Sequence, residues 1–84
     1  MKRTIACHIH DYFEAACVRN YTLEIERESA VKITGKAINI RYNKAKIECL
    51  EVAEEHTLTL IPLIDIRDAK VLDRDAQFLK IPIN

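Results

Sequence analysis

The segment that most restricts the possible folds is VKITGKAINIRY, which contains the only glycine of the chain, Gly35. Before this glycine, the apolar residues Val31 and Ile33 have odd numbers. After it, Ile38 and Ile40 have even numbers. Side chains alternate between the two faces of a strand, so a regular strand would turn the two pairs to opposite sides. A bulge or sharp bend at Gly35 would let both pairs face inward, and such bends coil a short sheet into a barrel.

Other segments with a period of two predict the remaining strands of this sheet. In YTLEIER, Leu23 and Ile25 would face inward, and in HTLTLI we expect the same of Leu58 and Leu60. Pro62 ends the latter strand because it has no amide hydrogen to donate. The predicted strands are 21–27, 31–42, 45–55, 56–61 and 66–72.

Residues 9–19 fit an amphipathic helix that precedes the strands. At 100° per residue one arc of this helix is apolar and consists of Ile9, Tyr12, Phe13, Ala16 and Cys17. The opposite arc carries Asp11, Glu14, Ala15 and Val18. The spacing of Asp11 and Glu14 is also that of a capping box, so the two acids have a second possible role at the start of the helix. Asn20 can end the helix because it tolerates the left-handed conformation.

The order of these elements predicts an α+β fold dominated by β-structure. An N-terminal helix is followed by a small five-stranded, strongly bent antiparallel barrel, which leaves no long open edge. With 84 residues, the chain is expected to be a single domain, 1–84, with the helix at 9–19, the barrel at 21–72 and a tail at 73–84. The tail either folds back as an edge strand or stays loose.

Composition excludes several classes of function. The formal net charge is zero, so the chain as a whole has no strong electrostatic field that would attract nucleic acid or anionic lipid. No apolar run approaches the roughly 20 residues that span a bilayer, and we expect no membrane association. Three cysteines cannot form a complete disulfide framework, and reduced thiols fit the cytoplasm, where we place the chain.

Several segments together resemble the Rof family, the Rho-binding antiterminators. They are IACHIHDYFEAAC, YTLEIE, ITGKA, IECLEV and TLTLIPLIDI, and the resemblance covers roughly residues 4–70. Its most specific parts are the spacing of Cys7, Asp11-Tyr12, Glu14 and Ala16-Cys17, and the run Gly35-Lys36-Ala37. The resemblance implies an Sm-like barrel with an N-terminal helix. It also implies a non-catalytic protein that binds the hexameric termination factor Rho, blocks RNA access to its primary RNA-binding site and so inhibits termination.

The resemblance also implies where Rho binds. Family members use the helix and a nearby loop, with acids opposing basic RNA-binding surface on Rho. The acids Glu54 and Glu55, at a hairpin tip, are placed to extend such a patch. The residues expected at the Rho interface are therefore Asp11, Glu14, Ala15, Val18, Glu54 and Glu55. On this hypothesis the protein needs no cofactor, does not bind nucleic acid directly and acts as a monomer.

Three alternatives remain open at this point. The first is an Sm-like RNA-binding module with a basic surface around the second hairpin, formed by Lys32, Lys36, Arg41, Lys44 and Lys46. The second is a zinc site made from Cys7, His8, His10, Cys17 and the more distant Cys49, although their spacing fits no known finger. The third is a thiol enzyme, which would need a base, an orienting partner and a substrate pocket.

Overall fold

The computed structural model describes residues 7–83 of the 84 residues. One helix precedes five strands, which confirms the predicted α+β class. The elements are α1 (Cys7–Val18), β1 (Thr22–Arg27), β2 (Lys32–Tyr42), β3 (Glu48–Ala53), β4 (Leu58–Pro62), the 3-10 turn η1 (Leu63–Asp65) and β5 (Ile66–Val71). No helix among the described residues is both long enough and apolar enough to cross a membrane.

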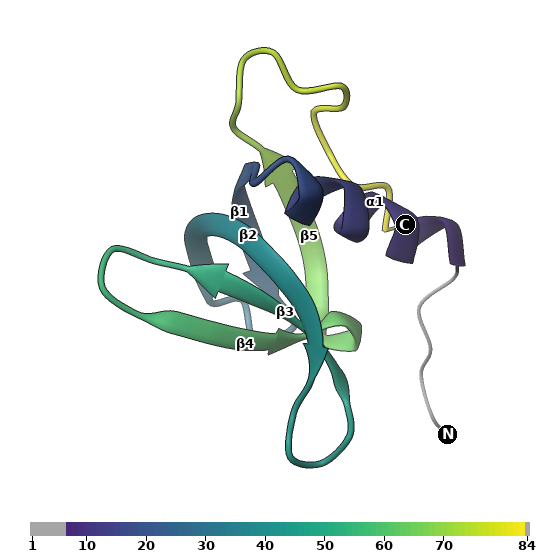
Figure 1. Ribbon diagram of the computed structural model, residues 1–84, viewed down its shortest axis with the longest axis vertical. Coiled ribbons are helices and arrows are strands. Elements are labelled where there is room, and N and C mark those ends of the chain that lie inside the picture. The colour runs from purple at the N-terminus through teal and green to yellow at the C-terminus, as the bar shows by residue number, and fades with distance from the viewer. Residues whose placement is uncertain (1–6, 84) are drawn as a thin grey trace.

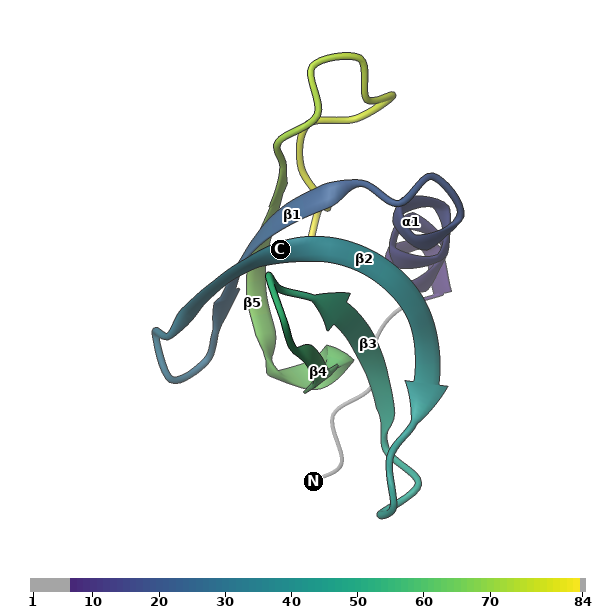
Figure 2. The same ribbon diagram turned by 60° about the vertical axis from the view of Figure 1, so that its left-hand side comes forward.

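The five strands form one antiparallel sheet in the order β4-β3-β2-β1-β5. The sheet curls strongly around the core, and α1 lies over it (Figures 1 and 2). The fifth strand pairs with β1, where Val71 lies opposite Leu23. Strands β4 and β5 are thus the two edges, linked by η1, and no ladder joins them within residues 7–83. The barrel is strongly bent, as predicted, but it is not closed.

Strand β2 changes its inward parity, as the sequence predicts, but the change lies three residues after the glycine. Ala37 lies opposite Val52 and Asn39 opposite Glu51, so Ile38 is the extra residue of a bulge. Because it is the extra residue, Ile38 is 39% exposed, and its predicted inward orientation is wrong. Val31 precedes the strand and is 53% exposed, whereas Ile33 and Ile40 pack against the core as predicted.

Gly35 has a different role from the predicted one, because it allows β2 and β3 to approach closely. A Cβ atom at Gly35 would lie 2.6 Å from the carbonyl oxygen of Ala53 and 2.6 Å from Cγ1 of Val52. Real Cβ atoms essentially never come this close, and one of the two obstacles is backbone. The tightest part of the curl therefore requires a residue without a side chain.

The predicted orientation of β4 is wrong. Leu58 and Leu60 face outward, whereas Ile61 is fully buried opposite Leu50. The strand has apolar residues on both faces, so alternation in the sequence could not identify the inner one. The inner face is set by the register with β3, which places Thr59 and Ile61 beside the inward residues of that strand.

Helix α1 has the predicted faces but begins earlier than predicted. The predicted apolar arc is buried or half-buried, whereas Asp11, Glu14 and Val18 are exposed. Because the helix begins at Cys7, Asp11 and Glu14 lie past its first turn, and the capping-box interpretation is wrong. Asn20 ends the helix with a φ of 51°, as predicted, and its side chain donates to the carbonyl oxygen of Ala37 on β2.

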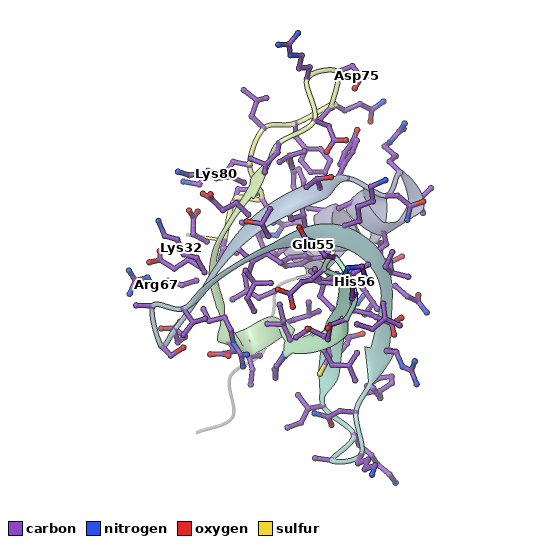
Figure 3. The ribbon with its side chains drawn as sticks, turned by 90° about the vertical axis from the view of Figure 1, so that its left-hand side faces the viewer. Lys32, Glu55, His56, Arg67, Asp75 and Lys80 are labelled. Atoms are coloured by element: carbon purple, nitrogen blue, oxygen red, sulfur yellow. The ribbon has the colours of Figure 1, made fainter. Side chains whose placement is uncertain are left out.

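The C-terminal tail folds back along the outer edge of β5 (Figures 1 and 3). The amide of Val71 donates to the carbonyl of Leu79 at 2.8 Å, and that of Ile81 donates to the carbonyl of Ala69 at 3.0 Å. Asp73 accepts from the amide of Thr22 at 2.6 Å. The sequence left open whether the tail folds back as an edge strand or stays loose. In the structure it folds back, and an isolated bridge joins Lys80 to Lys70, but it does not form a sixth strand.

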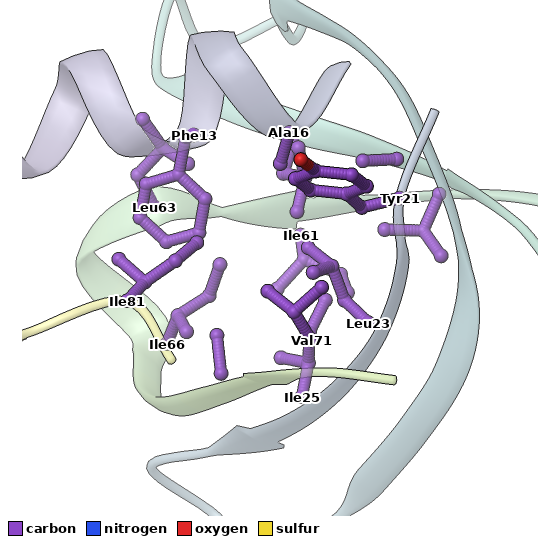
Figure 4. Packing of buried hydrophobic residues seen from close by; sticks show 14 of the residues in the cluster. Phe13, Ala16, Tyr21, Leu23, Ile25, Ile61, Leu63, Ile66, Val71 and Ile81 are labelled. Carbon is purple, nitrogen blue, oxygen red and sulfur yellow. The ribbon is translucent and has the colours of Figure 1, made fainter. Parts of the chain in front are cut away.

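The buried core joins the tail, the helix and the sheet into one cluster. In Figure 4, Phe13 of α1, Leu63 and Ile81 of the tail appear on one side of the cluster, and inward residues of β1, β4 and β5 make up the rest of it. Phe78 completes this junction, because its ring packs edge-on against Tyr12 at 5.0 Å and Tyr21 at 5.5 Å between ring centroids. The tail is thus part of the fold and also supports the underside of the helix.

Substitution Phe78→Leu is expected to lower the free energy of unfolding by about 1–2 kcal/mol, because both aromatic contacts are lost while most apolar volume is retained. Urea denaturation followed by circular dichroism measures this change. The control is Leu79→Ala, since Leu79 is 71% exposed and its loss should change stability little. Equal stability of the Phe78→Leu variant and the unchanged protein would contradict the anchoring role of the tail.

Candidate functional site

A pocket of about 270 Å³ lies where the C-terminal half of α1 faces β2 and the start of β3. Two of its lining residues are carboxylates, Glu14 from the helix and Glu48 from β3. The others are His10, Cys17, Val18, Asn39 and Ile40. The pocket therefore combines acids from two separate elements with an apolar wall.

His10 bridges the two carboxylates. Its Nδ1 atom lies 2.7 Å from Oε1 of Glu14, one helical turn further along α1. Its Nε2 atom lies 2.9 Å from Oε2 of Glu48, which is 38 residues away in the chain. Both ring nitrogens can donate only when the imidazole is protonated, so the charged form completes both contacts.

These contacts raise the pKa of His10 above its ordinary value. The hydrogen bond to Glu48 is the main cause, and the negative charges of Glu48 and Glu14 add to it. Partial burial of the ring opposes the shift without reversing it. The imidazolium form of His10 therefore persists to a higher pH than that of an isolated histidine.

The bridge is expected to make stability depend on pH. Because the pKa of His10 is raised in the folded state, its stabilising contribution is complete below the unfolded pKa of about 6.5 and is lost as the pH rises through the folded pKa. All three side chains are partly exposed, so the contribution is up to about 1 kcal/mol. Substitution His10→Ala should therefore lower the free energy of unfolding more at about pH 5.5 than at about pH 8.5.

Urea denaturation at the two pH values measures this difference. His56→Ala serves as the control because His56 is exposed at the tip between β3 and β4. A His10→Ala effect that is the same at both pH values would show that the bridge carries no proton-linked stability.

The two cysteines with described side chains are poor nucleophiles. Burial raises the pKa of Cys17 to about 11, and the charges of Glu14 and Glu51 act in the same direction. Burial also raises the pKa of Cys49. Both thiols are therefore protonated near neutral pH, whereas a cysteine acts as a nucleophile in its thiolate form. Neither thiol fits the catalytic alternative.

The structure brings together the four helix residues expected at the Rho interface. Asp11, Glu14 and Val18 are exposed, and Ala15 is half-buried. They occupy the face of α1 that points away from the core. Val18 is 83% exposed, which is unusual for a large aliphatic side chain and adds an apolar contact beside the acids.

Glu54 and Glu55 lie elsewhere, at the hairpin tip beyond the opposite end of β3 from Glu48 (Figures 1 and 3). Strand β3 has six residues and so spans roughly 20 Å. Glu54 accepts a hydrogen bond from Thr59 Oγ1 at 2.7 Å, whereas Glu55 is exposed. These acids do not line the pocket.

The basic residues of the RNA-binding alternative are spread along β2 and its loop. Lys32 begins the strand opposite Glu26, and it lies in the same region as Arg67 and Lys80 (Figure 3). Arg41, near the other end, pairs with Glu51 at 3.4 Å. Lys44 and Lys46 belong to the loop after the strand. These basic residues are therefore spread over the whole length of β2 and its loop, and neighbouring acids neutralise part of their charge.

The donors that could hold a metal ion differ from those considered in the sequence. Within residues 8–83, one group of three potential ligands lies within 4.8 Å: His10, Asp11 and Glu14. No cysteine joins this group, and its acids are exposed. The side chain of Cys7 lies outside the described residues. The donor set lacks the thiolates that the zinc alternative required.

Glu48 was not among the residues that the sequence singled out, and His10 was considered only as a possible zinc ligand. The spacing of His10 and Glu14 by four residues is visible in the sequence and predicts their contact on a helix. The contact with Glu48 depends on how α1 packs against β2, next to which β3 lies, and the local sequence contains no signal for this packing.

Comparison with known proteins agrees with this fold. The model of a family described as modulator of Rho-dependent transcription termination (ROF) matches residues 4–83. A solved structure described as YaeO bound to magnesium, from Vibrio cholerae O395, superimposes with a TM-score of 0.81. It is 24% identical in sequence, and the alignment covers 84% of this chain and 92% of that chain. No match was found among curated proteins.

Proposed function

The chain belongs to the Rof family of modulators of Rho-dependent transcription termination, and from this premise we propose that it binds Rho and blocks the entry of RNA into Rho's primary RNA-binding site. The family is regulatory, so the proposed activity is binding without catalysis. The contact surface in this proposal is the outer face of α1, with Asp11, Glu14, Ala15 and Val18. Glu54 and Glu55 supply a second point of contact.

The observation that supports this most is the location of the two helix acids. Asp11 and Glu14 are exposed and lie past the first turn of the helix, so helix capping does not account for them. A surface that binds RNA is rich in Lys and Arg. Carboxylates on a rigid helix can pair with these cations and compete with the phosphates of RNA.

The proposed mechanism is steric and electrostatic, and it uses a single copy of the chain. The tail covers the outer edge of β5, so this edge is not available for pairing with a second copy. Exposed charge pairs are screened by salt, so the affinity for Rho should fall as ionic strength rises. The chain's neutral net charge makes the local position of the acids decisive.

Two binding assays test the proposal. Purified protein immobilised on beads should retain Rho at low salt and release it at high salt. The same protein should not shift a single-stranded RNA oligonucleotide in a native gel. Retention of RNA together with no retention of Rho would instead favour the RNA-binding alternative.

A further inference from the structure

The pocket between α1 and β3 has the chemistry of a site for a cation on a flexible stem. Glu14 and Glu48 supply carboxylates from opposite walls, and Val18 and Ile40 supply apolar surface between them. A guanidinium or ammonium group pairs with carboxylates, while its aliphatic stem packs on apolar side chains. The volume of the pocket, about 270 Å³, is large enough for one side chain but too small for a folded segment.

His10 already holds the position that such a cation would need. When protonated, its ring contacts both carboxylates, at 2.7 Å and 2.9 Å. When neutral, it has one N–H group and can donate to only one of them. Loss of the proton therefore frees one carboxylate for another donor, and an arriving cation favours that loss by repulsion.

Among residues 8–83, the side chains that line the pocket include no lysine or arginine. The titratable groups next to His10 are Glu14 and Glu48, with Asp11 beside it on α1. Cys17 lines the same pocket and is close enough to Glu51 of β3 to feel its charge, and Glu51 in turn pairs with Arg41 of β2. The Cys17 thiol is uncharged near neutral pH. The remaining neighbours are all acidic, so the site stays attractive to a cation once His10 is neutral.

We propose that this pocket binds one cationic side chain of a protein partner, a guanidinium or ammonium group, between Glu14 and Glu48 in exchange for the proton on His10. The inference rests on the proposed function, because it specifies how one basic side chain of Rho is held. It adds Glu48, from β3, to the part of the proposed contact surface that the helix supplies. Binding then releases a proton and strengthens as the pH rises.

Two measurements test the proposal with Rho as the probe. The dissociation constant of the unchanged protein should fall about tenfold per pH unit below the titration of His10, and become constant above it. His10→Gln, which cannot take up a proton, should remove most of this slope. Glu48→Gln should weaken binding roughly tenfold or more. Glu24→Gln, the same change on the outer face of β1, is the control and should bind like the unchanged protein.

A test without Rho separates this inference from the proposed function. N-acetyl-arginine amide should lower the pH at which the His10 ring titrates, followed by NMR of the ring protons. Tetramethylammonium chloride at the same concentration has no N–H donor and should leave that pH unchanged. If Rho does not bind at any pH, the proposed function fails and this titration alone decides the pocket.

The inference is overturned if His10→Gln keeps the full pH slope, if Glu48→Gln binds Rho as tightly as Glu24→Gln does, or if the arginine amide leaves the His10 titration unchanged. NMR spectra of each variant establish that it is folded. A slope lost in His10→Gln, together with weak binding of Glu48→Gln, supports it.

Discussion

The double substitution Asp11→Lys and Glu14→Lys is expected to weaken binding to Rho at least hundredfold. Both carboxylates would become cations opposite a cationic surface, so attraction is replaced by repulsion, a change of about 3 kcal/mol or more. The fold should persist because both positions are exposed. The double variant should lose stability only through the contact between Glu14 and His10, which contributes up to about 1 kcal/mol to the free energy of unfolding. Isothermal titration calorimetry with Rho measures the affinity, and circular dichroism the fold.

A control of equal charge separates the specific contact from a general field effect. Glu24→Lys together with Asp75→Lys changes the net charge by the same amount on the outer face of β1 and on the tail. This variant should lose only the modest, salt-dependent part of the affinity. If both double variants lost affinity equally, the helix face would not be the contact surface.

Substitution Gly35→Ala is expected to be the most destabilising methyl addition to the sheet. The new Cβ would lie 2.6 Å from a backbone oxygen of β3, and moving that oxygen means moving the strand. Overpacking of this kind costs about 1–3 kcal/mol, and contact with backbone puts the effect at the upper end. In a domain of this size the melting temperature should fall by roughly 10–20 °C.

Lys36→Ala is the matched control, because Lys36 is the next residue of β2 and faces outward. Its melting temperature should stay near that of the unchanged protein. Gly35→Ala melting at the same temperature as Lys36→Ala would mean that β2 and β3 do not approach as closely as described.

The sequence predicted the buried face of the helix and the succession of one helix and five strands along the chain, because both depend on local periodicity. Phe13 and Ala16 recur at helical spacing, and Leu23 and Ile25 alternate with glutamates, so burial on one side leaves a clear pattern. In β4 the pattern failed. Leu58, Leu60 and Ile61 are all apolar, and the inner face is decided by the partner strand.

The helix start was misplaced for a related reason. Asp11 and Glu14 satisfy the capping-box spacing, but the helix begins at Cys7. The same spacing occurs in helix interiors, where exposed acids are common. This difference matters for function. A capping role would have explained the presence of Asp11 and Glu14 without a binding partner.

The pocket was only partly predictable. His10 and Glu14 are one turn apart on α1, but Glu48 joins them across 38 residues. The tail shows the same limit, since Phe78 meets Tyr12 and Tyr21 without any period in its own segment. Contacts of this range depend on the assembled fold and leave no local pattern.

Competition with RNA on Rho tests the central claim most directly. A fluorescently labelled single-stranded RNA bound to Rho is titrated with this protein, and its anisotropy is followed at constant salt. We expect RNA to be released and its apparent dissociation constant to rise in proportion to the protein concentration, whereas the Asp11→Lys, Glu14→Lys variant should release none. RNA that stays bound while the protein also binds, giving a ternary complex of higher anisotropy, would contradict it.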